Sequence, residues 1–413
     1  MTVSGALDGI KVLDLSRILA GPWAAQTLAD LGADVIKVER PDGGDDTRSW
    51  GPPWLNDADG NPTTDSAYYL AANRNKRAIT VDFTQSEGQA IIRALAAQSD
   101  ILIENYKLGG LAKYGLDYDT LSAVNPRLIY CSITGFGQTG PYAARPGYDL
   151  LIQAMGGLMS ITGERDEHPG GGPQRVGVAV IDLMTGMYSS VGILAALAAR
   201  TRTGRGQYLD IALLDVATAM LANQGMTYLT TGVSPVRTGN AHPNIVPYQD
   251  VPTADGAMIL AVGNDGQFAR FCDVLGAPEW ADDPRFATNP ARIENRIVLI
   301  DLIREHSVTR PTHEWIAALE GANVPCGPIN GIADVFADCQ VQSRDLRQSL
   351  DHVSAGPTPT IASPLRLSDT PVTYRNAPPV LGQHTHDVLG ELGLSAEAIA
   401  VLAAKNIIYT NSH

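Results

Sequence analysis

The strongest fold signal in this 413-residue chain lies in residues 10–39, which read IKVLDLSRILAGPWAAQTLADLGADVIKVE. Ile10–Leu15 is rich in β-branched and aliphatic residues and predicts a strand. Pro22 favours the first turn of a helix, and Gly32 is typical of the point where a helix ends. Val35–Glu39 predicts a second strand. A strand–helix–strand unit of this length implies two parallel strands joined by a right-handed crossover.

The same alternation of strands and helices continues along the first part of the chain. Ala78–Phe83, Ile101–Glu104 and Leu128–Ile133 predict further strands, with helical segments between them. The chain is therefore expected to form an α/β fold with a doubly wound, mostly parallel sheet. Gly, Pro and Asn become frequent from residue 231 to 249, and a second, smaller unit is expected at about 225–330.

Composition and charge narrow the class of protein. The chain has 30 Lys and Arg against 44 Asp and Glu, and its net charge of −14 disfavours a nucleic acid or an anionic membrane as partner. The longest apolar run, Val191–Ala199, is shorter than the ~20 residues of a membrane-spanning helix, and the N-terminus does not read as a secretory signal. The cysteines form no Cys-x-x-Cys pair, so neither disulfides nor a zinc site are expected. A soluble cytoplasmic enzyme is the expectation.

Parallel sheets bind ligands beyond the carboxyl ends of their strands, so residues at those ends are candidate ligand contacts. Arg17, Arg40 and Lys107 each follow a predicted strand, and Asn105 and Tyr106 directly precede Lys107. Cations, backbone amides at a helix start and an aromatic ring suit a phosphorylated ligand that contains a ring. The alternative is that these cations are only solvated surface charges.

A nicotinamide dinucleotide is one ligand of that kind, since Glu39 ends the second strand, where an acid would bind a ribose. The first strand is not followed by Gly-x-Gly-x-x-Gly, however, and that turn contains only Gly21. Arg40 also follows Glu39 directly. The sequence therefore disfavours a dinucleotide.

A set of ordered motifs runs from residue 7 to residue 406. They are LDLSRILAGP at 13–22, GADVIKVERP at 32–41, NRNKR at 73–77, IENY at 103–106, SITGFG at 132–137, TGRGQ at 203–207, PCGP at 325–328 and LGQHT at 381–385. Together they resemble the class III CoA-transferases, the family that includes formyl-CoA:oxalate and carnitine CoA-transferases and the related α-methylacyl-CoA racemases.

Three further motifs are most similar to one branch of this family, which moves CoA from succinyl-CoA to dicarboxylates such as glutarate or itaconate. They are GDDTR at 44–48, GPP at 51–53 and AHPNIVPYQ at 241–249. The resemblance implies CoA transfer from an acyl-CoA, here succinyl-CoA, to a free carboxylic acid, here a dicarboxylate. CoA is then a substrate, and no cofactor is bound permanently.

The resemblance also implies a fold and a partner. Members of the family form interlocked homodimers, in which each chain has a Rossmann-like large domain and a small domain. Here the large CoA-binding domain would comprise residues 1–224 and 331–413, and the small α+β domain would comprise residues 225–330. The implied partners are thus an acyl-CoA, a small carboxylic acid and a second copy of the chain.

The family's nucleophile is an aspartate near a helix start, and the matching position is Asp182 in VAVIDL, residues 178–183. A carboxylate that attacks a thioester forms a mixed anhydride and then an aspartyl-CoA thioester, which divides the exchange into easier steps. With a reference pKa of ~3.9, Asp182 would be ionised at neutral pH without a separate base. Apolar neighbours such as Ile181 would keep water away. On the residues alone, Asp182 would instead be the N-cap of that helix.

The resemblance implies a set of CoA contacts, of which Arg40 and Lys113 would meet phosphates, and Leu19 and Tyr106 would flank the adenine or pantetheine. The full set is Leu19, Ala20, Arg40, Val81, Thr84, Asn105, Tyr106, Lys113, Arg145 and Tyr148. His242 and Arg17 are possible acceptor-binding residues, and no metal site is implied.

Tyr148 separates the activities within the family. Racemases have a histidine at this position that exchanges the α-proton, whereas a tyrosine with a pKa near ~10 is a poor proton acceptor. A racemase-type isomerase and a non-catalytic acyl-CoA-binding homologue remain the alternatives to a transferase. Asp149, next to Tyr148, either forms hydrogen bonds in the site or supports its loop.

Overall fold

The computed structural model describes residues 5–411, which divide by their contacts into two compact units. Unit 1 comprises residues 5–158, 176–226 and 340–411, and unit 2 comprises residues 159–175 and 227–339. Residues 159–175 thus belong with unit 2, although the predicted boundaries place them in the large domain. The division into a large and a small folding domain stays a prediction.

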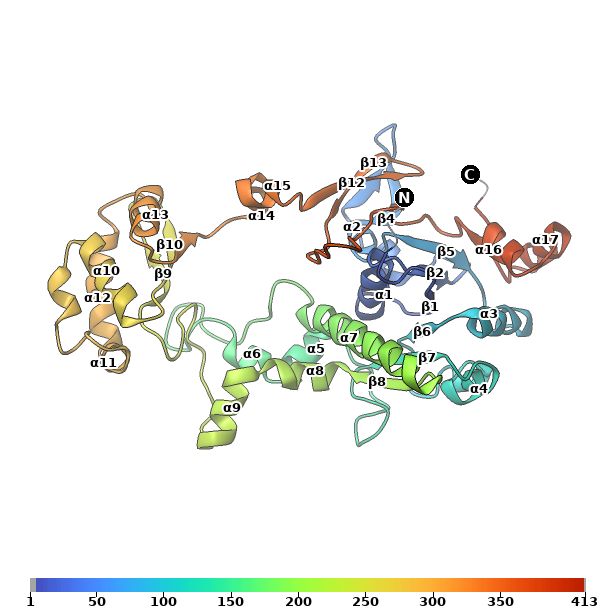
Figure 1. The fold of residues 1–413 in the computed structure, drawn as a ribbon, viewed down its shortest axis with the longest axis horizontal. Helices are drawn as coiled ribbons and strands as arrows, with labels where there is room; N and C mark the ends of the chain where they lie inside the picture. Colours follow the sequence, from blue (N-terminus) through green and yellow to red (C-terminus); the bar gives the residue numbers. More distant parts are fainter. Residues whose placement is uncertain (1–4, 412–413) are drawn as a thin grey trace. The chain divides into compact units, whose positions relative to one another are not determined.

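Unit 1 is built on a six-stranded parallel sheet with the strand order β5-β2-β1-β6-β7-β8 (Figure 1). β1 pairs with β2 on one side, Val12 opposite Val35, and with β6 on the other, Leu13 opposite Leu102. The predicted α/β fold with a parallel central sheet is therefore confirmed. The strands are β1 Lys11–Asp14, β2 Asp34–Glu39, β5 Lys76–Thr80, β6 Ile101–Glu104, β7 Ile129–Thr134 and β8 Tyr208–Ala212.

The sheet is buried on both faces, because successive side chains of a strand point to opposite sides. One face packs against α1 (Ala20–Asp30) and α7 (Val180–Thr203), which also contact each other. Val12 of β1 lies in this core with Leu28 of α1 and Ile193 of α7. The loop after β1 and the start of α7 are consequently anchored in the same apolar core.

The opposite face packs against α3 (Ser86–Gln98) and two helices from the end of the chain, α16 (Thr385–Glu391) and α17 (Ala396–Ala404). Leu13 of β1 and Leu389 of α16 share this second core. Helices on both faces make the sheet doubly wound, as the sequence predicts. Segments from the two ends of the chain therefore complete one unit.

Helix α7 has 24 residues and is apolar enough to cross a membrane by length and composition alone. The apolar run Val191–Ala199 is only part of this helix. The side of α7 that includes Ile181, Ile193 and Ala196 is buried in the core of unit 1. Core helices of soluble proteins pass the same test, so this helix is only a weak indication of a membrane.

Unit 2 contains a three-stranded antiparallel sheet with the order β11-β10-β9, against which α12 and α13 pack. Its core includes Phe268, Phe271, Leu299 and Trp315, all of them buried. Its elements are β9 Tyr248–Pro252, β10 Ala257–Ala261, α10 Asp265–Leu275, η3 Pro278–Ala281, α11 Asn289–Glu294, α12 Arg296–Ser307, α13 Thr312–Gly321, β11 Cys326–Pro328 and α14 Ile332–Ala337.

The remaining elements are short. Two antiparallel pairs, β3-β4 and β12-β13, lie outside the main sheets. The bounds are η1 Asp46–Ser49, β3 Trp54–Asn56, β4 Pro62–Ser66, α2 Ala67–Leu70, η2 Ala112–Tyr114, α4 Tyr118–Val124, α5 Asp149–Met155, α6 Leu158–Ile161, α8 Leu213–Met220, α9 Ala222–Thr231, α15 Cys339–Ser343, β12 Arg347–His352 and β13 Gly356–Ile361.

Candidate active site

A cavity of about 150 Å³ lies at the carboxyl ends of β1, β6 and β7, the edge at which parallel sheets bind ligands. Asp182, from the first turn of α7, lines this cavity together with several other predicted site residues. They are Arg17, Leu19, Ala20, Asn105, Tyr106, Arg145 and Tyr148. The cavity lies entirely within unit 1.

Asp182 is mostly buried and does not cap its helix. The cap position of α7 is Ala179, which makes no side-chain cap hydrogen bond, so the interpretation of Asp182 as an N-cap is wrong. Burial, together with the nearby charge of Asp149, raises the pKa of Asp182 to about 7. The carboxylate is therefore only partly ionised at neutral pH, in contrast to the expectation from the reference value.

Asp149, the first residue of α5, accepts hydrogen bonds from backbone amides at the start of α7. Its Oδ1 accepts hydrogen bonds from the amides of Ile181 at 2.8 Å and Asp182 at 3.2 Å. Its Oδ2 accepts a hydrogen bond from Nε2 of Gln153 at 2.6 Å. Free amides at a helix start would lower the pKa of Asp182, but here they donate to the carboxylate of Asp149 instead. Asp149 thus both supports its loop and lies beside the candidate nucleophile.

Tyr68 in α2 is a residue near this site that the sequence analysis missed. Burial and the charges of Asp182 and Asp149 raise the pKa of its hydroxyl to about 12, so the hydroxyl stays protonated. Its ring packs edge-on against Trp50, with 5.0 Å between the ring centroids. No motif singles out this tyrosine, because its approach to α7 depends on the tertiary fold.

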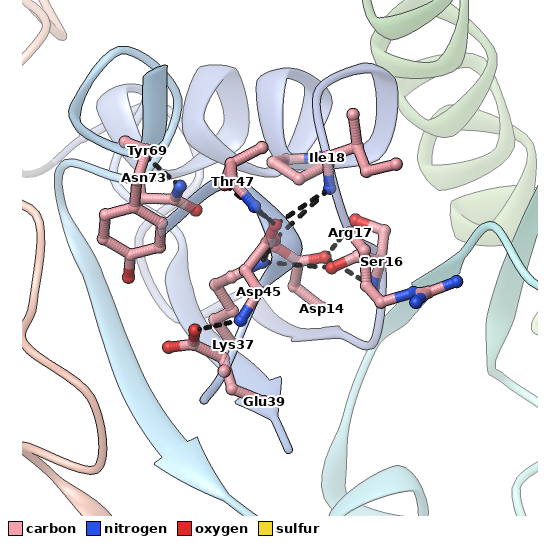
Figure 2. Close-up of polar contacts among 12 residues, drawn as sticks. Asp14, Ser16, Arg17, Ile18, Lys37, Glu39, Asp45, Thr47, Tyr69 and Asn73 are labelled. Carbon is pink, nitrogen blue, oxygen red and sulfur yellow. Dashed lines mark hydrogen bonds and ion pairs between the residues drawn. The ribbon is translucent and has the colours of Figure 1, made fainter. Parts of the chain in front are cut away.

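The loop after β1 is strained at Ile18, which has a φ of 71°. A β-branched residue rarely adopts this left-handed conformation, which costs about 1–3 kcal/mol. The amide of Ile18 donates to Oδ1 and Oδ2 of Asp45 at 3.2 and 3.3 Å (Figure 2). Asn105 accepts from the amide of Arg17 at 2.9 Å and donates to the carbonyl of Arg17 at 2.7 Å. The loop that brings Arg17 and Leu19 to the cavity is therefore fixed from two sides.

Two fully buried lysines form ion pairs next to this loop. Lys37 Nζ lies 2.8 Å from Oδ2 of Asp45 and donates to the carbonyl of Ser16 at 3.0 Å (Figure 2). Lys76 Nζ lies 2.9 Å from Oδ2 of Asp14. Burial alone would raise the pKa of Asp45, but Lys37 lowers that pKa to about 2. Removing one partner of a buried ion pair is costly, so these pairs resist displacement of the loop.

A second cavity in unit 1, of about 940 Å³, contains the other predicted contacts. Arg17, Tyr106 and Lys107 line both cavities, so the two share a border. The predicted residues that line only the larger cavity are Arg40, Val81, Thr84 and Lys113. Its volume and its several cations suit a large phosphorylated ligand.

The larger cavity also has two features that the sequence did not indicate. Asp46 pairs with Arg17 at 3.1 Å and with Arg40 at 3.0 Å, so one carboxylate joins two candidate ligand-binding arginines. Residues near the end of the chain complete the wall. They are Ala403, Asn406, Ile408, Tyr409 and Thr410. The amide of Tyr409 donates to Oγ1 of Thr80 in β5 at 2.6 Å, and the same hydroxyl donates to the carbonyl of Tyr409 at 2.7 Å.

Arg145 and Tyr148 lie on the loop that leads into α5. The guanidinium of Arg145 lies 4.6 Å from the ring centroid of Tyr142 and 5.2 Å from that of Phe136. Tyr148 is 62% exposed. These two predicted contacts therefore reach the smaller cavity from its solvent side.

His242 belongs to unit 2. Its Nδ1 accepts a hydrogen bond from the amide of Asn244 at 3.1 Å, and its ring packs against Tyr248. A role of His242 toward an acceptor acid stays a prediction. Within residues 5–411, no group of three or more His, Cys, Asp or Glu side chains is placed to hold a metal.

Comparisons with known proteins show which family this chain resembles. The family model described as CoA-transferase family III matches residues 7–385. The chain is 54% identical over 386 residues to a succinate–glutarate CoA-transferase of Agrobacterium fabrum, covering 94% of this chain and 95% of the relative. It is 42% identical over 403 residues to the succinyl-CoA:glutarate CoA-transferase of Homo sapiens, covering 97% and 90%.

A solved structure resembles most of this chain. The crystal structure of a CAIB/BAIF family protein from Brucella suis has a TM-score of 0.83 and 51% sequence identity. The match covers 94% of this chain and 100% of that one.

Proposed function

This chain belongs to CoA-transferase family III, and we propose that it moves CoA from succinyl-CoA to a free dicarboxylate of the glutarate kind. Relatives named for succinate or succinyl-CoA and for glutarate support this pair of acids. The observation that carries the proposal is the placement of Asp182. This mostly buried carboxylate lines a small cavity that borders a larger, cation-lined one.

The donor half of the reaction begins with Asp182. A carboxylate oxygen attacks the thioester carbon of succinyl-CoA, the carbon–sulfur bond breaks, and CoA leaves as a thiolate from a mixed anhydride. The thiolate then attacks the side-chain carbonyl carbon of Asp182. The anhydride carbon–oxygen bond breaks, succinate leaves, and an aspartyl-CoA thioester remains.

The acceptor half repeats these steps in reverse order. The carboxylate of the acceptor attacks the aspartyl thioester, which releases the thiolate and forms a second mixed anhydride. The thiolate attacks the acyl carbon of the acceptor, and Asp182 leaves as a free carboxylate. No nucleotide is consumed and no net proton is transferred, so the site needs an ionised and poorly hydrated carboxylate more than a general base.

We infer that the nucleotide part of CoA binds in the larger cavity and that its thioester reaches the smaller one. Arg40 and Lys113 would hold phosphates, and Tyr106 at the shared border would flank the pantetheine. The remaining proposed CoA contacts are Leu19, Ala20, Val81, Thr84, Asn105 and Tyr148. We also infer, from the family, that the protein is an interlocked homodimer and acts in the cytoplasm. The mass of the protein in solution tests the dimer.

The covalent intermediate gives the sharpest test. The enzyme is incubated with succinyl-CoA, reduced with borohydride and digested, and the peptide that contains Asp182 is weighed. Conversion of this side chain to an alcohol is expected, because borohydride reduces a thioester or anhydride but not a free carboxylate. Free CoA in place of succinyl-CoA is the control and should leave Asp182 unchanged.

A pair of variants completes the test. Asp182→Asn should lose at least about 1000-fold in transfer from succinyl-CoA to glutarate, because the amide cannot form the anhydride. Asp59→Asn, an exposed aspartate in the turn between β3 and β4, should keep full activity. Full activity of Asp182→Asn would refute the proposal. Exchange of the α-proton of an acyl-CoA with D₂O, without any acceptor acid, would indicate an isomerase instead.

A further inference from the structure

Arg145 differs from the other cations of the candidate site in where it lies. Three cations line the cavity of Asp182: Arg17, Lys107 and Arg145. Arg17 and Lys107 also line the larger cavity, whereas Arg145 lines only the smaller one. Arg145 is exposed to solvent, and the only one of the two cavities that it lines is that of the nucleophile, which places it for the acyl group rather than for the nucleotide.

The guanidinium of Arg145 is held without a counter-charge. Tyr142 and Phe136 lie 4.6 and 5.2 Å from it, and these two rings pack edge-on against each other with 5.6 Å between centroids. One terminal nitrogen contacts the sulfur of Met155 at 4.0 Å. Among the described residues no carboxylate forms an ion pair with Arg145, whereas Arg17 is paired with Asp46.

Lys107 likewise has no ion pair among the described residues, but unlike Arg145 it also lines the larger cavity. Aromatic faces orient an arginine and leave the edge of its guanidinium free to donate hydrogen bonds. That edge matches the two oxygens of a carboxylate. A dicarboxylic acyl group on Asp182 has a second, ionised carboxylate, which would lose hydration in the cavity unless a cation received it.

We propose that Arg145 binds the remote carboxylate of the acyl group that is transferred, and so selects dicarboxylates over monocarboxylates. This inference rests on the proposed function, because it requires acyl transfer at Asp182. It changes the role that the family resemblance implies for Arg145, from a CoA contact to an acid contact. The same arginine would bind the succinyl group and then the glutaryl group, since each is covalently bonded to Asp182 during its own half-reaction.

The test compares wild type with Arg145→Gln and Arg145→Lys, and uses the exposed Arg205→Gln as a matched control. Initial rates of transfer from succinyl-CoA are measured over a range of glutarate and of valerate, its monocarboxylate counterpart. Calorimetric titration gives the Kd of free CoA for each variant. Arg145→Gln should raise the KM for glutarate roughly 10- to 100-fold, the range expected for one charge-assisted contact.

The other measurements separate the alternatives. The kcat/KM for valerate, which reports only the acceptor half-reaction, and the Kd of CoA should stay within about threefold of wild type. Arg145→Lys should recover part of the loss because it keeps the charge. An unchanged KM for glutarate in Arg145→Gln would overturn the inference. A Kd of CoA raised as much as the KM would also overturn it, since Arg145 would then bind CoA. Absence of transfer to glutarate in wild type would refute the proposed function itself.

Discussion

Replacing Asp182 with asparagine should stabilise the protein, and more so at alkaline than at acidic pH. The folded-state pKa of Asp182 is about 7, raised from the ordinary value of 3.8 by burial and by Asp149. A carboxyl group whose pKa is raised on folding disfavours the folded state once it ionises. The penalty is absent below the unfolded pKa, grows as the pH rises, and is complete above the folded pKa.

The size of the effect follows from the difference between the two pKa values, from 3.8 to about 7. At ~1.4 kcal/mol for each pKa unit, ionisation of Asp182 costs about 4 kcal/mol at pH 8. At pH 5 the folded carboxyl is still protonated, and the same linkage gives a cost of about 2 kcal/mol. Asp182→Asn removes the ionisable group at nearly constant shape and should recover these amounts.

Thermal unfolding of wild type and Asp182→Asn at pH 5 and pH 8 measures the difference. The gain in Tm should be several degrees at pH 8 and about half as large at pH 5. Asp59→Asn is the control, because it removes a solvent-exposed carboxylate. A gain that is equal at the two pH values, or no gain at pH 8, would refute the argument that burial of this carboxylate destabilises the fold.

Three further outcomes are expected. Asp149→Asn keeps a side-chain oxygen that accepts from the amides of α7 but removes a charge that raises the pKa of Asp182. The acid limb of the pH–rate profile should therefore move to lower pH. An unmoved limb would show that burial alone sets this pKa. Lys37→Met leaves Asp45 buried without its ion-pair partner and should lower the free energy of unfolding in urea by about 3–5 kcal/mol. The double variant Lys37→Met/Asp45→Asn should regain more than half of this loss. Additive losses from the two substitutions would contradict an ion pair between Lys37 and Asp45. Lys113→Gln should raise the KM for succinyl-CoA about tenfold with little change in kcat, and equal effects on kcat and KM would argue against a phosphate contact.

The parallel sheet was predictable because its strands are read from local patterns. Ile10–Leu15 and Val35–Glu39 have the β-branched and aliphatic residues of buried strands. In the structure β1 lies within the first segment, and β2 covers the second segment and begins one residue earlier. The predicted strand Ala78–Phe83 is displaced from the observed Lys76–Thr80. An apolar pattern cannot include Lys76, whose burial depends on its distant partner Asp14.

The details of the candidate site were less predictable, because they depend on contacts between distant segments. Asp182 has the local signature of a helix cap, yet Asp149, which lies 33 residues away in sequence, bonds to its backbone amide. Tyr68 and the wall near Tyr409 join the site only through the tertiary fold. Motif resemblance located the nucleophile position, whereas the origin of its raised pKa required the structure.

Unit 1 is assembled from segments that are far apart in the sequence, and this has a consequence for biosynthesis. One side of the central sheet is covered in part by α16 and α17, and Ile408 near the end of the chain belongs to the same core. These helices leave the ribosome long after β1 and β6, so a nascent chain lacks part of the cover of Leu13 and Leu102 until α16 and α17 have been made. Long-range closure of this kind slows folding and favours aggregation of unfinished chains. Expression at lower temperature, or with chaperones that shield apolar surface, should therefore raise the soluble yield.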